Sequence, residues 1–476
     1  MLNKYRRYAL EKLSTVGPKY MPFADVATAD VPLSRLLRLS LFQVTVGMAL
    51  VLLVGTLNRV MIVELSVPAT LVGVMLALPI VFAPFRVLIG FKSDTHISAL
   101  GWRRVPFIWK GTMLQFGGFA IMPFALLVLS GYREAADAPL WIGHSSAALA
   151  FLLVGAGVHT VQTAGLALAT DLVRTEDQPK VVGLMYVALL VGMIISALAF
   201  GALLENYSPG RLIQCIQGAA VVTIALNMVA IWKQEPRDRV RAHSKAPKQK
   251  FDESWRAFAR NAGALRLLII IGLGTAGFGM ADVLIEPFGG QALGMSVAAT
   301  TKLTAVMAFG GLIGFGIASK VLSRADGSPS VIANTGALIG VPAFFGIIAT
   351  LYVPSVALFV LAVLFLGLGA GLFGHGTLTA TMRAAPKEQV GLALGTWGAV
   401  QATAAGLAVA IGGIMRDLIT GWSAAGQASA ANAYLPVFML EIVLLIAACI
   451  VLAPMMAKRA KPRQNATRAY VKREAS

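Results

Sequence analysis

Twelve apolar stretches, each long enough to cross a bilayer, form two sets of six on either side of a basic segment. An α-helix rises about 1.5 Å per residue, so crossing about 30 Å of hydrocarbon takes roughly 20 apolar residues. The pattern therefore predicts an all-α membrane protein with twelve transmembrane helices in two six-helix halves. The predicted spans are residues 36–60, 69–91, 105–130, 145–170, 181–204, 211–232, 265–288, 298–322, 331–351, 355–380, 389–415 and 434–456.

The same pattern sets the domain organisation. Only 13% of the residues are charged and 57% are hydrophobic, a composition that excludes an ordinary soluble domain. Cys215 and Cys449 lie inside predicted spans, so neither a disulfide framework nor a metal site is expected from them. The predicted segments are an N-terminal tail (1–35), a first half (36–232), a basic linker (233–264), a second half (265–456) and a C-terminal tail (457–476).

The basic residues are distributed unevenly between the connections. The net charge is +18, and 31 of the 40 Lys and Arg residues lie in the tails and in the connections that share their side of the membrane. Positive charge gathers on the cytoplasmic side of membrane proteins, so both termini are expected in the cytoplasm. The charge is a topology signal, helped by anionic lipid, and a nucleic-acid partner is not expected.

The two halves resemble each other, as expected for the major facilitator superfamily. The run VVGLMY from Val181 is similar to QVGLAL from Gln389 in the second half. Parallel six-helix repeats joined by a long connector are typical of that superfamily. Between spans two and three, major facilitators carry Gly-x-x-x-Asp followed by a basic cluster. The residues that match here are Gly90, Asp94, Arg103 and Arg104.

Two interpretations of this loop remain open. A carboxylate at a helix end can pair with arginines or with a neighbouring helix N-terminus, so the loop is interpreted as a latch between the halves. Alternatively, it is a solvated loop whose arginines only set the topology.

Charged groups within a membrane are costly, which makes them functional candidates. Asp282 and Glu286 are spaced i,i+4 and are predicted to share one helix face, where they would bind a proton or cation or accept hydrogen bonds. The alternative places both at the non-cytoplasmic helix end near headgroup water. Arg59 is interpreted either as reaching the interface or as pairing with Glu64 or a distant acid, and Arg86 lies deeper.

His159 and His375 are the two histidines inside predicted spans, in equivalent helices of the two halves. A neutral imidazole can ligate the Mg²⁺ of a chlorin, and Gln162 adds polarity near one turn beyond His159. The alternative is a hydrogen bond from each histidine to a neighbouring helix. Further polar candidates for a central cavity are Lys110, Gln115, Lys302, Gln401 and Glu441.

Long motifs resemble the PucC family of photosynthetic purple bacteria, the bacteriochlorophyll-delivery branch of the major facilitators, which also includes the LhaA proteins. The resemblance covers nearly the whole chain apart from the tails and the linker. The motifs that carry it are the block from Pro32 to Trp109, LALATDLVRTEDQPKVVGLMY, ADVLIEPFGGQALGMSVAATTKLTA and GLGAGLFGHGTLTATM.

The resemblance implies an assembly factor for light-harvesting complexes in the bacterial inner (intracytoplasmic photosynthetic) membrane. Such a protein supplies bacteriochlorophyll, as a transient ligand, to antenna α/β polypeptides or holds those polypeptides during assembly. The core-antenna LH1 branch is slightly favoured over LH2. The reaction centre and pigment-synthesis enzymes are further expected partners, beside membrane lipid.

Two other functions remain open. A proton-coupled transporter of a small solute would use Asp282 and Glu286 as coupling acids, whereas a scaffold would bind antenna polypeptides without pigment. The sequence contains no phosphate-binding glycine loop followed by Lys-Ser/Thr, and no hydrolytic or redox constellation. An enzyme, a bound nucleotide and a resident metal are therefore not expected.

Overall fold

The structure is a computed structural model of the chain. It describes most of the helical residues and leaves out the tails, the linker and parts of several connections. The described residues are 31–79, 86, 89, 93, 102–131, 135, 137–174, 177–235, 262–322, 324, 327–384, 390–423 and 433–460.

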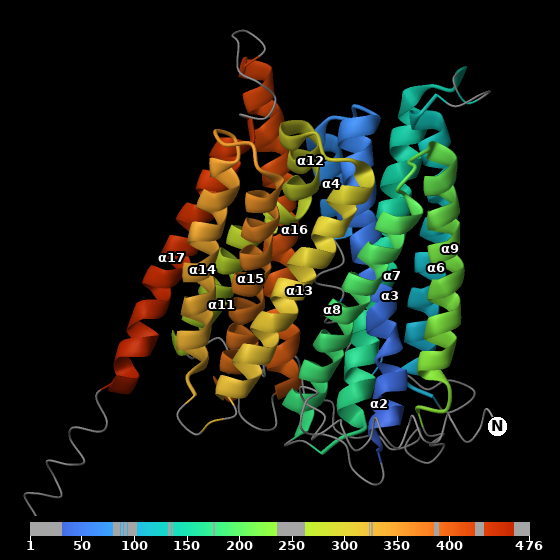
Figure 1. Cartoon of the computed structure of the whole chain (residues 1–476). Coiled ribbons are helices and arrows are strands. Elements are labelled where there is room, and N and C mark those ends of the chain that lie inside the picture. Colours follow the sequence, from blue (N-terminus) through green and yellow to red (C-terminus); the bar gives the residue numbers. More distant parts are fainter. Residues whose placement is uncertain are drawn as a thin grey trace, which may run out of the picture.

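Long helices run side by side through the whole molecule (Figure 1). Within the described residues, 11 helices are long and apolar enough to cross a membrane. The remaining predicted span, 69–91, begins with α4 (Ala69–Ala77), and its residues 80–85, 87–88 and 90–91 lie outside the described residues. The chain is thus a multi-pass membrane protein.

The helices before the linker form one group, which we call the first group. They are α2 (Leu33–Leu39), α3 (Leu41–Leu50), η2 (Val51–Leu57), η3 (Val60–Glu64), α4, α6 (Val105–Leu129), α7 (Leu140–Asp171), α8 (Gln178–Leu203) and α9 (Pro209–Ile231).

The helices after the linker form the second group. They are α11 (Ala262–Gly279), α12 (Ala281–Leu293), α13 (Val297–Leu322), α14 (Pro329–Ala349), α15 (Val356–Ala384), α16 (Val390–Ser423) and α17 (Leu435–Ala460). We call the end of the bundle where α2 begins the linker end, at the bottom of Figure 1, and the opposite end, near α4 and α12, the far end.

Span one differs from a regular helix. It runs from Leu33 to Glu64, longer than the predicted 36–60, and its second half contains the π-helical turns η2 and η3. A π turn widens the helix by one residue and often occurs at functional sites. In this chain the widened turns lie against α12 and α13 of the second group.

Span seven is broken where one continuous helix, 265–288, was predicted. Met280 separates α11 from α12, and α12 continues to Leu293, where Gly294 ends it in the left-handed conformation with φ +63°. Glycine adopts this conformation without steric cost and often follows a helix C-terminus. Asp282 and Glu286 therefore lie in the first turns of α12, away from its C-terminal end.

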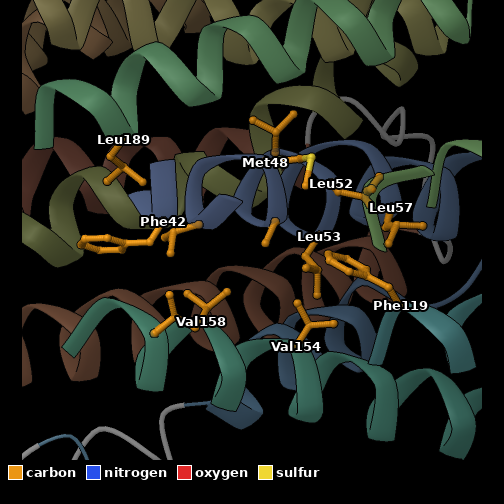
Figure 2. Packing of buried hydrophobic residues seen from close by; sticks show 14 of the residues in the cluster. Phe42, Met48, Leu52, Leu53, Leu57, Phe119, Val154, Val158 and Leu189 are labelled. Carbon is orange, nitrogen blue, oxygen red and sulfur yellow. The ribbon is translucent and has the colours of Figure 1, made fainter. Parts of the chain in front are cut away.

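Two large hydrophobic clusters lie among the described residues, and the one centred on the first group also includes second-group residues such as Leu267 and Leu378. In the first group, Phe42, Leu52 and Leu57 of span one pack beside Phe119 of α6 and Val154 of α7 (Figure 2). A second cluster gathers aromatic side chains from α12, α14, α15 and the start of α17. Because lipid is as apolar as these side chains, close fitting rather than water exclusion holds such helices together.

Glycines allow the closest helix approaches. A Cβ on Gly118 of α6 would lie 2.7 Å from the Ala150 carbonyl oxygen of α7. Between the groups, a Cβ on Gly413 of α16 would lie 2.5 Å from the Ala69 carbonyl oxygen of α4. Small residues at such crossings let helix backbones touch.

Candidate functional site

Polar side chains within the bundle gather at two places, one between the helix groups and one within the first group beside α16. The first, the far-end cluster, contains Thr56, Asn58, Arg59, Glu64, Glu286, Thr301 and Thr304. The second, the Arg86 cluster, contains Gln43, Arg86, His159, Gln162 and Thr163.

Arg59 anchors the far-end cluster. Its side chain is 3% exposed, forms an ion pair with Glu64 and donates a hydrogen bond from Nη2 to the Met295 carbonyl oxygen at 3.1 Å. Arg59 therefore pairs locally, as one of the predicted alternatives had it, and joins span one to the end of α12. Next to this pair, burial and the Glu64 carboxylate raise the pKa of Tyr207 to about 12, so its phenol stays protonated.

Glu286 of α12 lies against Gly55 of span one. Its carboxylate accepts a hydrogen bond from Thr304 of α13 and is almost completely buried. The absence of a side chain on Gly55 leaves room for this carboxylate. Its second oxygen, Oε2, is buried and has no hydrogen-bond partner among the described residues.

Asp282 and Glu286 have different surroundings although they are one turn apart. Asp282 is exposed and Glu286 is buried. At the break before them, the Ala281 N–H donates to Oε1 of Glu441 at 2.6 Å. Glu441, counted among the polar residues of the spans, is completely buried in α17 and satisfies the first N–H group of α12.

The Arg86 cluster lies between span two and α7. Arg86 donates from Nε to Thr163 Oγ1 at 3.2 Å and from Nη2 to Gln162 Oε1 at 3.0 Å. Gln162 in turn donates from Nε2 to Gln43 Oε1 at 3.4 Å. The structure thus brings two sequence candidates, Arg86 and Gln162, into direct contact.

The two histidines lie in different settings. His159 is on α7, near enough to Arg86 for an electrostatic interaction, and its Nδ1 is buried without a hydrogen-bond partner in the described part of the chain. His375 on α15 is 5% exposed, and its ring lies 4.7 Å from the Phe315 ring, centroid to centroid. His159 as a whole is partly exposed, whereas His375 is buried.

Aromatic rings connect His375 to the other helix group. Tyr186 of α8 lies 6.3 Å from Phe315 of α13 and 6.0 Å from Trp397 of α16, between ring centroids. Trp397 donates from Nε1 to Thr377 Oγ1 at 3.3 Å. Sequence reasoning missed Tyr186 and Trp397, because single aromatic residues in apolar helices give no signal.

Of the predicted latch, Gly90 and Asp94 lie outside the described residues. Arg103 and Arg104 pair with Asp171 at the end of α7, at 3.4 and 3.1 Å, and Arg104 also donates to Ser93. Glu235 accepts hydrogen bonds from the backbone N–H groups of residues 103–105, at the start of α6. These contacts join helix ends within the first group, and the latch between the halves stays a prediction.

Glu235 is a functional candidate that sequence reasoning missed. The sequence feature that could have identified it is an acidic residue among the basic residues at the start of the linker. A carboxylate at a helix N-terminus is favoured by the helix dipole. Elsewhere among the described residues, no three His, Cys, Asp or Glu side chains gather to hold a metal ion.

The structure is similar to solved structures of membrane transporters. The structure is similar to that of a D-xylose–proton symporter, with a TM-score of 0.68 and 14% sequence identity over 87% of this chain and 96% of the symporter chain. At this identity the likeness shows the fold alone. The chain has the major facilitator fold predicted from its sequence.

Sequence comparison is more specific. "Protein PucC" of Rhodovulum sulfidophilum is 64% identical over 88% of this chain and 92% of its own length. "Protein PucC" of Rhodobacter capsulatus is 61% identical over 95% of this chain and 98% of its own length. The model of the family described as PUCC protein matches residues 56–460. The resemblance found in the motifs is confirmed, and the chain belongs to the PUCC protein family.

Proposed function

We propose that this chain is a non-enzymatic assembly factor for photosynthetic light-harvesting complexes. It delivers bacteriochlorophyll to antenna α/β polypeptides, or holds these polypeptides while pigment is added. Family membership supports the assembly role, since the most similar relatives reported above carry the name Protein PucC. The higher basic content of one side supports a cytoplasmic location of both termini.

The observation that carries the pigment part is the setting of His159. Its Nδ1 is not used in a hydrogen bond to any described residue, which weakens the alternative of a structural histidine. A neutral imidazole nitrogen can bind the Mg²⁺ of bacteriochlorophyll from the axial side. The ring lies on α7 near Arg86, and Arg86 itself lies beside Gly398 of α16 in the other helix group.

Small-residue helix faces and lipid-exposed apolar side chains suit a carrier of a hydrophobic pigment. Free bacteriochlorophyll is apolar and aggregates in water, so a carrier within the bilayer would keep it dispersed. The major facilitator fold supplies two helix groups that move relative to each other in transporters. A groove between such groups can release a bulky ligand sideways into the membrane.

Purification of the tagged protein from photosynthetically grown cells tests the proposal. We expect a bacteriochlorophyll absorption band and co-eluting antenna polypeptides. His159→Ala is expected to lower bound bacteriochlorophyll at least severalfold. His144→Ala, on the same helix but about four turns away, is the matched control and should leave pigment content unchanged.

The alternatives give different results. Antenna polypeptides without pigment would favour a scaffold. A colourless protein without antenna polypeptides, together with normal antenna levels in a deletion strain, would contradict the assembly role. Variants of Asp282 and Glu286 in α12 would then be tested in proton-coupled transport assays. The relative loss of LH1 and LH2 in the deletion strain decides the branch, for which LH1 is the prediction.

A further inference from the structure

The N-terminus of α4, in the first group, is capped by a residue of the second group. α4 follows Pro68, whose side chain offers no acceptor, and its first turn contains no acidic residue. The first N–H groups of a helix have no partner within the helix and need acceptors elsewhere. The Thr70 N–H donates to Oδ2 of Asp417 on α16, at 2.5 Å. The start of α4 therefore finds an acceptor across the boundary between the groups.

A second set of contacts holds the carboxylate of Asp417 in place. Its Oδ1 forms an ion pair with Nη1 of Arg416 at 2.8 Å. Arg416 Nη2 donates to Oε1 of Gln291 on α12 at 3.0 Å, and the same oxygen accepts a hydrogen bond from the Tyr434 hydroxyl at 2.6 Å. The guanidinium also lies over the Tyr434 ring, 5.5 Å from its centroid. Asp417 is thus oriented from within its own group and presents its second oxygen to α4.

Close backbone contact between α4 and α16 accompanies this pairing at the far end (Figure 1). A Cβ on Gly413, one turn before Asp417, would lie 2.5 Å from the Ala69 carbonyl oxygen. A Cβ on Gly73 would lie 3.1 Å from the Val409 carbonyl oxygen. Small residues let helix backbones approach this closely. The hydrogen bond from α4 to Asp417 depends on this approach, so it breaks whenever the groups part at the far end.

The position of Asp417 suits a contact that forms and breaks. Its side chain is 20% exposed, so water can solvate the carboxylate once it leaves α4. While the contact lasts, the positive end of the helix dipole attracts the charge, and the charged acceptor strengthens the hydrogen bond. Glu441 differs, because it is completely buried and caps α12 within the second group, away from water.

We propose that Asp417 is the latch residue of the far end, and that the negative charge it presents to the N-terminus of α4 holds the two helix groups closed there. A carboxylate that pairs with an arginine and a helix N-terminus is the chemistry predicted from the sequence for the loop that contains Asp94. Here residues of α16 and α4 supply it at the far end. This role does not depend on which ligand the protein carries.

Labelling of a buried cysteine measures opening of the far end. Thr56 of span one is 0% exposed and lies against Thr301 of the second group, so a cysteine there should react with a water-soluble maleimide only when the groups separate. The full-length protein is purified in detergent, in a background without the native cysteines. Asp417→Asn keeps an oxygen for the Thr70 N–H but removes the charge. It should raise the labelling rate of Thr56→Cys about tenfold.

Three further variants assign the effect to the charge of Asp417. Asp137→Asn makes the same charge change on an exposed residue between α6 and α7, at the same end of the bundle, and should leave the rate unchanged. Asp417→Glu keeps the charge and should be labelled more slowly than Asp417→Asn. Thr223→Cys, completely buried in α9 of the first group, reports unfolding, and its labelling should stay slow in every background.

Three results would overturn the latch. One is unchanged labelling of Thr56→Cys in the Asp417→Asn background. Another is an equal increase in the Asp137→Asn background, which would show a general effect of surface charge. The third is an equal increase at Thr223→Cys, which would make Asp417 a residue of overall stability. None of these measurements involves pigment or antenna polypeptides, so failure here is distinguishable from failure of the proposed function.

Discussion

Glu441 is a carboxylate placed in the apolar interior of the second helix group. It is 0% exposed, its Oε1 accepts from the Ala281 N–H, and its Oε2 has no hydrogen-bond partner among the described residues. The first N–H groups of a helix need acceptors, and here a distant helix supplies one. The side chain thus holds the start of α12, the helix that carries Asp282 and Glu286.

Substitution of Glu441 separates the acceptor from the charge. Glu441→Gln keeps an oxygen for the Ala281 N–H and should leave thermal stability in detergent unchanged or raised, because it removes a potential buried charge. Glu441→Leu leaves a buried N–H without an acceptor and should cost about 1–3 kcal/mol. The midpoint of thermal loss of the monodisperse size-exclusion peak measures both. Equal destabilisation by Gln and Leu would instead show that the negative charge itself is needed.

Side-chain pairs could be predicted from the sequence where the two residues are close in the chain. The Arg59–Glu64 pair was among its alternatives because five helical residues bring both side chains to one region. It could not pair Glu441 with Ala281, since 160 residues separate them and only the packing of α17 against the break brings them together. Arg86 and Gln162 were likewise both candidates, but the hydrogen bond between them could not be predicted from the sequence.

Helices α6 and α7 show how single glycines set the distance between elements. Gly111 and Gly118 are two turns apart on α6, and a Cβ on either would lie within 3 Å of a backbone carbonyl oxygen of α7. The neighbouring Gly117 has nothing within 4 Å of its Cβ position. One face of α6 therefore requires glycine, while the adjacent residue does not.

This difference gives a matched pair of substitutions. Gly118→Ala places a methyl group 2.7 Å from the Ala150 carbonyl oxygen and should destabilise the protein by about 1–3 kcal/mol through overpacking. Gly117→Ala should be neutral or stabilising by up to about 1 kcal/mol, because alanine favours the helix. Thermal unfolding of both variants in the same detergent makes the comparison. If the two variants lost equal stability, close α6–α7 contact would not be the cause.

The elements themselves were largely predictable, because a span is defined by length and hydropathy. The helical breaks were not. Span seven reads as one apolar run, and the N–H of Ala281, just after its interruption at Met280, donates to Glu441 of a distant helix. The π-helical turns of span one likewise lie against α12 and α13, which are distant in the sequence.

At the scale of the whole molecule, described hydrogen bonds join the two helix groups at the far end. Thr56 and Thr301 hydroxyls lie 3.2 Å apart, and Asn58 donates to the Val283 carbonyl oxygen at 2.5 Å. The Thr70 N–H donates to Asp417 Oδ2 at 2.5 Å. Together with Arg59 and Met295, these contacts describe a conformation in which the groups are closed against each other at this end.

Cysteine cross-linking tests whether the protein adopts this conformation in its membrane. Hydroxyl oxygens 3.2 Å apart place the two Cβ atoms near the separation that a disulfide requires. In a background without Cys215 and Cys449, Thr56→Cys with Thr301→Cys should therefore cross-link upon mild oxidation. Loss of maleimide labelling on a gel measures the reaction. The control pair, Thr56→Cys with Thr381→Cys, places the cysteines near opposite ends of the bundle and should remain labelled.

The extent of cross-linking also reports whether the groups move. A static bundle closed at the far end would cross-link completely and at one rate, with or without pigment. A bundle that opens at this end, as in a transporter that alternates between two states, would cross-link more slowly when a ligand favours the open state. We expect pigment to alter the rate, because a ligand between the groups contacts helices of both. Failure of the Thr56–Thr301 pair to exceed the control would contradict the closed arrangement itself.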